Sequence, residues 1–149
     1  MSVWRGCDIP TDRSYDVDGD LWVLFENDLV RLGLTDVAQT RMGRMVTIRF
    51  KQPGRRVKAG GSVATVESAK WVGPVHTPFA GEVVAANETG FAEDILIANR
   101  DPYQAGWISL FRPDPPGQPD RPLLQGDEAV AAYQARIDAL EVSCFRCED

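Results

Sequence analysis

The sequence is divided into short apolar segments separated by residues that favour turns. Apolar segments of strand length lie at 21–25, 29–34, 45–50, 63–67, 72–75, 81–86 and 107–111. Glu26-Asn27-Asp28 separates the first two, which predicts a hairpin, and Pro53-Gly54 follows the third. Short segments bounded by such residues are typical of strands. The pattern therefore predicts a mainly β fold, a small barrel or sandwich.

Short helices are predicted beside these strands. The segment from Asp36 to Met42 can form a helix, with Thr35 or Asp36 accepting hydrogen bonds from its first amides and Gly43 ending it. The segment 91–97 predicts a brief helix or a loop.

A longer helix is predicted near the end of the chain, over 126–141. Its alanines favour helix, and Asp127 is a suitable N-cap. One stripe of this helix is apolar and consists of Val130, Tyr133, Ile137 and Leu140. We expect the stripe to pack on the β domain rather than to bind a partner.

A proline-rich segment separates the predicted strands from this helix, with prolines at 113, 115, 116, 119 and 122. Proline lacks an amide donor, so the segment should be extended and unpaired. We therefore divide the chain into an N-terminal extension (1–14), a β domain (15–113), a proline-rich connection (114–125), a C-terminal helix that packs on the domain (126–143) and a cysteine-containing tail (144–149).

Composition excludes several classes of function. The net charge is −6, from 22 acidic and 16 basic residues, which disfavours nucleic acid as a partner. No apolar run is long enough for a membrane span, and Met1 to Pro10 lacks the features of a secretory signal, so a cytoplasmic location is expected. The cysteines are Cys7, Cys144 and Cys147, an odd number, and cytosolic thiols are usually reduced, so a disulfide framework is not expected.

The most informative segment is 54–87, in which Gly- and Val-rich stretches surround Lys70. Two strands that meet at a tight turn would present this lysine at the tip, where a modifying enzyme can reach its amine. Taken alone, Lys70 would be interpreted as an ordinary surface lysine. The surrounding pattern instead favours a lysine that is presented for modification.

Four stretches of the sequence resemble the lipoyl H-proteins of the glycine cleavage system. Glu67-Ser68-Ala69-Lys70 matches the Glu-Ser-x-Lys turn of that family, whereas the biotin signature is absent. The other three are Gly33-Leu-Thr-Asp-Val-Ala-Gln39, Thr77-Pro-Phe-Ala-Gly-Glu-Val83 and Asn99-Arg-Asp-Pro-Tyr-Gln-Ala-Gly-Trp107. The resemblance spans about residues 15–140 and implies a barrel-sandwich hybrid of the lipoyl/biotinyl type, with short helices and a C-terminal α-helix.

The resemblance also implies a cofactor and partners. Lipoic acid would form an amide with Lys70, with Glu67 and Ser68 in the turn that a lipoate ligase or lipoyl transferase recognises. The dithiolane ring holds its disulfide away from the preferred dihedral angle, which makes it easier to open. The chain would then be a covalent carrier and not itself an enzyme, serving partner enzymes and a reoxidant of the dihydrolipoamide dehydrogenase type.

The sequence departs from the family where the carried amine is held. The usual Ser-His-Glu-Trp is here Gly19-Asp-Leu-Trp22, and the usual Asp four residues after the lysine is Pro74. Burying an amine without acceptors is costly, so the expected cradle for an aminated cargo is missing. Trp71 makes the surface beside the lysine apolar and is a candidate contact of the arm. These features resemble the lipoate-binding proteins of the heterodisulfide-reductase-like sulfur oxidation system.

We therefore predict a shuttle for sulfur intermediates that acts with a heterodisulfide-reductase-like complex. The first alternative is a glycine cleavage H-protein, which takes an aminomethyl group from glycine decarboxylase to a tetrahydrofolate-dependent partner. The second is an unlipoylated binding module. The third is a thiol oxidoreductase that uses Cys144 and Cys147, since a C-x-x-C pair can be a redox dithiol. An incidental pair is the preferred interpretation over that redox role, and no metal site is predicted.

Three further side chains are interpreted mainly as structural. His76 is the only histidine and is interpreted as an ordinary surface residue, with proton transfer near the arm as the alternative. Trp22 and Trp107 are expected in the core.

Overall fold

The computed structural model describes residues 2–147, so the last two residues of the predicted 144–149 tail lie outside it. Its strands are β1 (Ser2–Trp4), β2 (Cys7–Ile9), β3 (Ser14–Asp16), β4 (Leu21–Glu26), β5 (Leu29–Leu34), β6 (Met45–Phe50), β7 (Arg56–Val57), β8 (Ser62–Ser68), β9 (Val72–His76), β10 (Gly81–Ala86) and β11 (Ser109–Pro113). Its helices are α1 (Asp36–Met42), α2 (Glu88–Glu93), α3 (Ile97–Arg100) and α4 (Gly126–Leu140).

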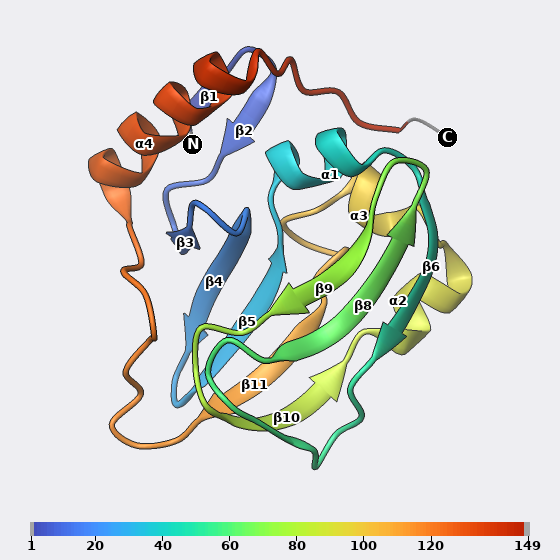
Figure 1. Ribbon diagram of the computed structural model, residues 1–149, viewed down its shortest axis with the longest axis vertical. Helices are drawn as coiled ribbons and strands as arrows, with labels where there is room; N and C mark the ends of the chain where they lie inside the picture. The colour runs from blue at the N-terminus through green and yellow to red at the C-terminus, as the bar shows by residue number, and fades with distance from the viewer. Residues whose placement is uncertain (1, 148–149) are drawn as a thin grey trace.

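The strands form three sheets, which confirms the predicted mainly β fold. A six-stranded sheet has the order β3-β4-β5-β11-β10-β7, and a three-stranded sheet has the order β6-β8-β9. These two sheets face one another, and the small β1-β2 pair lies near α4 (Figure 1). Every strand pairing within residues 2–147 is antiparallel.

Local sequence signals account for the β4-β5 hairpin. β4 and β5 pair from Leu21↔Leu34 to Glu26↔Leu29, which leaves Asn27 and Asp28 as a two-residue turn. Asn27 has φ +60°, a conformation that asparagine tolerates and that tight hairpin turns require. The predicted hairpin is therefore confirmed.

The buried apolar side chains form two clusters. The first, here called the sheet core, lies between the two larger sheets and includes Val23, Leu32, Val66, Val83 and Ile108. The second, here called the terminal core, joins the ends of the chain and consists of Cys7, Ile9, Tyr15, Trp22, Val37, Tyr103, Ala129, Tyr133 and Ile137.

Helix α4 packs on the domain, as its apolar stripe predicts. Tyr133 and Ile137 are buried in the terminal core, but Leu140 is 37% exposed and Ala129 is buried instead. The predicted N-cap is wrong: the helix begins at Gly126, and the capping position is taken by Gln125, whose side chain makes no capping hydrogen bond. Asp127 lies in the first turn, where a carboxylate still interacts favourably with the helix dipole. No helix of residues 2–147 is long and apolar enough to cross a membrane.

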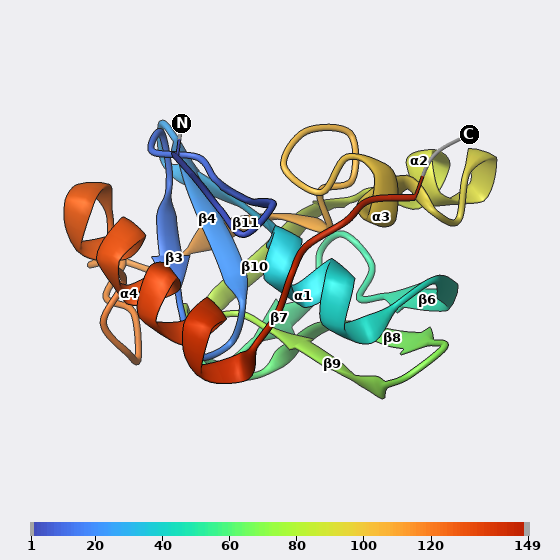
Figure 2. The ribbon, with the colours of Figure 1, turned by 90° about the horizontal axis from the view of Figure 1, so that it is seen from above.

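The structure pairs Cys7 with Cys144 in a disulfide, so the expectation of reduced thiols is wrong for these two residues. Their Cα atoms lie 4.8 Å apart although 137 positions separate them in sequence. The fold brings them together because α4 turns the end of the chain back past the β1-β2 pair (Figures 1 and 2). Cys147 remains a free thiol, so Cys144 is not bonded to its C-x-x-C neighbour.

Candidate functional site

The tip of the β8-β9 hairpin presents Lys70. β8 and β9 pair up to Glu67↔Val72, and the amide of Ser68 donates to the carbonyl of Trp71 at 2.8 Å. Ala69 and Lys70 are thus the two central residues of a tight turn, and both are exposed. The predicted presentation of this lysine at a hairpin apex is confirmed.

The hairpin tip rests on the loop between α1 and β6. The amide of Lys70 donates to the carbonyl of Met42 at 3.1 Å, and the amide of Ala69 donates to the carbonyl of Arg44 at 2.9 Å. Ser68, buried beneath the turn, donates its hydroxyl to the same Met42 carbonyl at 2.7 Å. The backbone of the turn is therefore held by the end of α1 and the loop after it, while Lys70 itself is exposed.

Helix α1 ends where the lysine turn needs an acceptor. Thr35 caps the start of the helix, since its hydroxyl accepts from the amide of Ala38 at 3.2 Å. Gly43 ends it with φ +75°, a conformation that costs glycine little, and its amide still donates to Gln39. This early end leaves the carbonyl of Met42 free to accept from the turn.

Asn99 holds the same loop from the opposite side. It is 1% exposed, and its amide nitrogen donates to the carbonyl of Gly43 at 2.8 Å. Its side-chain oxygen accepts from the amide of Met45 at 3.0 Å. One buried side chain therefore connects the end of α1 to the start of β6, on which the lysine turn rests.

A cleft of about 440 Å³ opens beside Lys70. Its apolar wall comes from α1, β4, β5 and the hairpin. Its charged wall combines three aspartates with three arginines. Apart from Lys70, the cleft is lined by residues that include Leu21, Leu34, Met42, Trp71, Pro74, Asp16, Asp18, Asp20, Arg41, Arg121 and Arg136.

Two of the cleft carboxylates are already paired with guanidinium groups. Asp20 accepts two hydrogen bonds from Arg136, at 2.9 Å each, and lies 3.5 Å from Arg41. Asp16 accepts from Arg121 at 3.2 Å. Burial raises the pKa of Asp16, and its contacts with Arg121 and the amide of Gly19 offset this only partly.

The chain is similar to proteins of known family and structure. The glycine cleavage H-protein family matches residues 13–136. Glycine cleavage system H protein 2 of Aquifex aeolicus is 42% identical over 145 residues, which cover 97% of this chain and 89% of the relative. A probable glycine cleavage system H protein 2 of Sulfolobus acidocaldarius is 38% identical, over 99% of this chain and all of the relative.

This chain belongs to the glycine cleavage H-protein family. A crystal structure of the H protein of Mycobacterium marinum superposes with a TM-score of 0.71 at 31% identity, covering 84% of this chain and 98% of that one. The neighbour agrees with the predicted lipoyl-type barrel-sandwich fold. H-proteins carry lipoate covalently attached to a lysine, and they are carrier subunits rather than enzymes themselves.

The predicted site residues occupy different positions in this H-protein. Glu67 is exposed on β8, Ser68 is buried beneath the turn, and the exposed His76 lines the cleft. Trp71 is 42% exposed, and a side chain at Gly73 would lie 2.4 Å from its ring. Gly73 thus leaves room for the indole to fold back along β9.

The structure fully buries only one of the two tryptophans that were expected in the core. Trp22 is buried in the terminal core and donates to the carbonyl of Pro102 at 2.9 Å. Trp107 is only partly buried, and the guanidinium of Arg31 lies 4.5 Å from its ring centroid.

The charged wall of the cleft was not predicted from the sequence. The expectation that acceptors are missing beside the lysine needs correction, because Asp16, Asp18 and Asp20 line the cleft. Arg121 and Arg136 come from the connection and from α4, far along the chain from the lysine motif. Asp20 belongs to the segment Gly19-Asp20-Leu21-Trp22, which the family resemblance already placed where the cargo is held. No local sequence pattern placed the two arginines at the site.

Proposed function

We propose that this H-protein carries its lipoyl group on Lys70 and moves a group held on the lipoyl sulfurs between partner active sites. One observation carries the proposal: Lys70 lies at the apex of a two-residue turn, next to a cleft of about 440 Å³. A tethered arm raises the local concentration of its cargo at each partner. A lipoate ligase or transferase would recognise the turn at Glu67 and Ser68, and a dihydrolipoamide dehydrogenase-type enzyme would reoxidise the arm. A cytoplasmic location is part of the proposal.

Intact mass spectrometry tests the attachment. The chain is produced with a working lipoylation apparatus, as wild type, Lys70→Arg and Lys58→Arg. Lys58 is an exposed lysine outside the hairpin and serves as the matched control. Wild type and Lys58→Arg should gain the mass of one lipoyl group, and Lys70→Arg should gain none. A lipoylated Lys70→Arg variant, or an unmodified wild type, would contradict the proposal.

The names of the relatives support an aminomethyl cargo. Every relative described above is named as an H protein of the glycine cleavage system. We therefore take glycine cleavage as the first candidate setting, with a glycine decarboxylase to load the arm. Asp18 is exposed at the cleft, and its carboxylate is an acceptor for an ammonium group.

A specific observation supports sulfur as the second candidate cargo. The buried carboxylates of Asp16 and Asp20 are occupied by Arg121 and Arg136, so a cationic amine would meet guanidinium groups of like charge. The cleft also has an apolar wall that includes Trp71 and Pro74. These features favour an uncharged or sulfur-based cargo, and a heterodisulfide-reductase-like complex would be the partner.

The extent of the similarity adds to this second candidate. Three numbered H proteins of Aquifex aeolicus each match 97% of this chain, whereas an H protein of Thermus thermophilus matches 80% of it. Several copies in one organism give room for a specialised role beside glycine cleavage. Cys7 and Cys144 lie outside the 13–136 region that the family matches.

A loading assay separates the two cargoes. The lipoylated chain is incubated either with glycine decarboxylase and isotopically labelled glycine or with a polysulfide donor, and its mass is measured. The Thermus thermophilus H protein serves as the reference for aminomethyl loading. Loading with the labelled carbon at the rate of the reference would reject the sulfur candidate. Stable sulfur addition that requires Lys70, without aminomethyl loading, would reject glycine cleavage.

A further inference from the structure

The disulfide anchors the segment that follows α4. Cys7 is fully buried and Cys144 partly buried, and the amide of Cys144 donates to the carbonyl of Arg5 at 3.0 Å. Gly6 has φ +79°, and a side chain there would lie 2.6 Å from the carbonyl oxygen of Cys144. The turn between β1 and β2 therefore receives this segment at close range.

Beyond the disulfide, the chain crosses α1 (Figures 1 and 2). The carbonyl of Phe145 accepts from the side-chain amide of Gln39 at 2.7 Å and from the hydroxyl of Thr40 at 3.3 Å. The ring of Phe145 is exposed, so this contact is made by the backbone and not by an apolar side chain.

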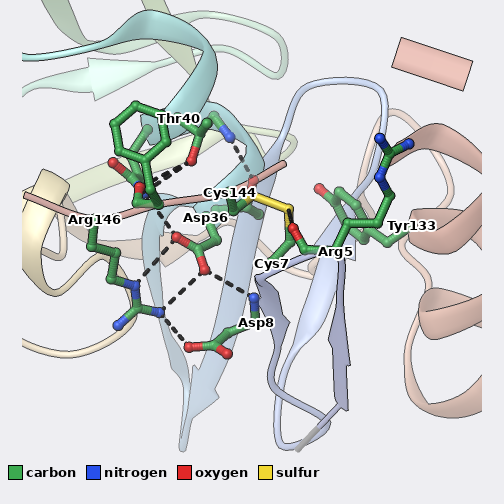
Figure 3. Close-up of a disulfide and its surroundings, with 12 residues drawn as sticks. Arg5, Cys7, Asp8, Asp36, Thr40, Tyr133, Cys144 and Arg146 are labelled. Carbon is green, nitrogen blue, oxygen red and sulfur yellow. Dashed lines mark hydrogen bonds and ion pairs between the residues drawn. A yellow bond between two sulfur atoms is a disulfide. The ribbon is translucent and has the colours of Figure 1, made fainter. Parts of the chain in front are cut away.

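Arg146 joins the segment to a buried carboxylate. Its guanidinium donates to Asp36 at 3.3 and 3.4 Å and to Asp8 at 2.7 Å (Figure 3). Asp36 is 1% exposed, and a buried carboxylate needs such partners. The segment is therefore bound to the start of α1 and, through Asp8, to β2.

Cys147 completes a connection to the lysine turn. Its amide donates to the carbonyl of Asn99 at 3.2 Å. The side chain of Asn99 holds the carbonyl of Gly43 and the amide of Met45. Between these two residues the carbonyl of Arg44 accepts from the amide of Ala69, and just before them the carbonyl of Met42 accepts from the amide of Lys70. A short series of hydrogen bonds thus connects the end of the described chain to the hairpin tip.

We propose that the disulfide-bonded segment 144–147 is a redox-sensitive clamp that positions the Lys70 turn. Arg146 and Asn99 are positioning residues: they act through α1 and the 43–45 loop, and they do not touch Lys70. While Cys144 is bonded to Cys7, the segment is held on α1. When the bond opens, the segment is held only by its hydrogen bonds and ion pairs and releases more often. The proposal does not depend on the cargo or on acylation of Lys70.

The chemistry of opening is a thiol–disulfide exchange with a dithiol, the class to which a dihydrolipoyl arm belongs. A thiolate attacks the sulfur of Cys144, the more accessible of the two, and Cys7 leaves as a thiolate. The second thiol of the reductant then displaces Cys144 and closes a cyclic disulfide. The dithiol is oxidised by two electrons, the protein disulfide is reduced by two, and the two protons end on Cys7 and Cys144.

Hydrogen exchange on the full chain tests the clamp. Amide exchange is compared between the oxidised protein and the protein reduced with dithiothreitol, in peptides that cover 36–45, 66–72, 81–86 and 109–113. Reduction should raise exchange by about tenfold at 36–45 and 66–72, the change expected from losing one or two hydrogen bonds. The peptides of β10 and β11 should change little, because these strands lie in the sheet core.

Two variants make the test specific. Arg146→Gln keeps the disulfide but removes the ion pairs with Asp8 and Asp36, and it should raise exchange in the same two peptides without reductant. Cys147→Ser keeps both the disulfide and the backbone hydrogen bond to Asn99, and it should behave as wild type. If reduction frees 144–147 but leaves 66–72 unchanged, or raises all four peptides equally, the clamp is rejected.

Discussion

The lysine hairpin and the joined chain ends are stabilised in different ways. The hairpin is built from neighbouring segments, with β8 and β9 paired directly and Lys70 in the turn between them. The chain ends are joined by contacts between residues far apart in sequence, such as Cys7 with Cys144 and Asp20 with Arg136. The working part of the molecule is thus specified locally, and its support is specified by the fold as a whole.

This difference shows where the molecule can vary without losing its basic role. The β8-β9 turn with its Glu-Ser-x-Lys sequence is formed by neighbouring residues, and in the proposed clamp the chain ends only affect how firmly it is held. Arg121 and Arg136, from the connection and α4, instead set the charges of the cleft beside Lys70. The lysine turn and the charges beside it are therefore encoded in separate parts of the chain.

The largest effect is expected from moving the lysine by one position. The variant Ala69→Lys with Lys70→Ala keeps the composition and charge of the turn. Of the two turn positions, 70 lines the cleft and 69 does not, since adjacent residues of a hairpin turn point in different directions. We expect a near-complete loss of lipoylation, measured by intact mass. Equal modification at position 69 would show that exposure at the tip suffices and that the cleft does not matter.

The sequence predicted the hairpin side far better than the terminal side. Alternating apolar residues, glycines and prolines gave β4 to β6 and β8 to β10, because these signals act within a few residues. The disulfide could not be predicted, since pairing Cys7 with Cys144 requires the course of the whole chain. The salt bridges at the cleft were missed for the same reason: Asp20 and Arg136 come together only when α4 docks.

A matched pair of core substitutions compares the two clusters. Ile108 in the sheet core and Ile137 in the terminal core are both fully buried. Each Ile→Ala variant should lower the free energy of unfolding by about 2–5 kcal/mol, measured by urea denaturation.

The coupling of each substitution to the disulfide sharpens the comparison. Ile137 shares its cluster with Cys7. The changes in the free energy of unfolding caused by Ile137→Ala and by reduction of the disulfide should therefore not be additive. Ile108→Ala and reduction should add to within about 0.5 kcal/mol, since the sites are in different clusters. Non-additivity for both residues would show that the two cores are not separate units, and additivity for Ile137 would show that it is not coupled to the disulfide.

Removing the guanidinium from Asp20 should have a smaller effect. Arg136→Gln removes two hydrogen bonds from a buried carboxylate, which among residues 2–147 keeps only the hydroxyl of Tyr133 at 3.4 Å and the guanidinium of Arg41 at 3.5 Å. We expect the free energy of unfolding to fall by about 1–3 kcal/mol. The control is Arg112→Gln, an exposed arginine on β11 outside the cleft, which should change stability by less than about 0.5 kcal/mol. Equal effects of the two variants would mean that Arg136 is only a surface charge.

The smallest effect concerns the pH dependence that Asp16 contributes to stability. Burial raises the pKa of its carboxyl in the folded chain above the ordinary value of 3.8. The folded state therefore binds more protons than the unfolded state just above pH 3.8, and the contribution of Asp16 to stability should fall as pH rises through that window. The measurement is the unfolding free energy of wild type minus that of Asp16→Asn at a series of pH values, in which other groups largely cancel. A difference that rises with pH would mean that the pairing with Arg121 outweighs burial, and the charged wall of the cleft would then favour the ionised carboxylate.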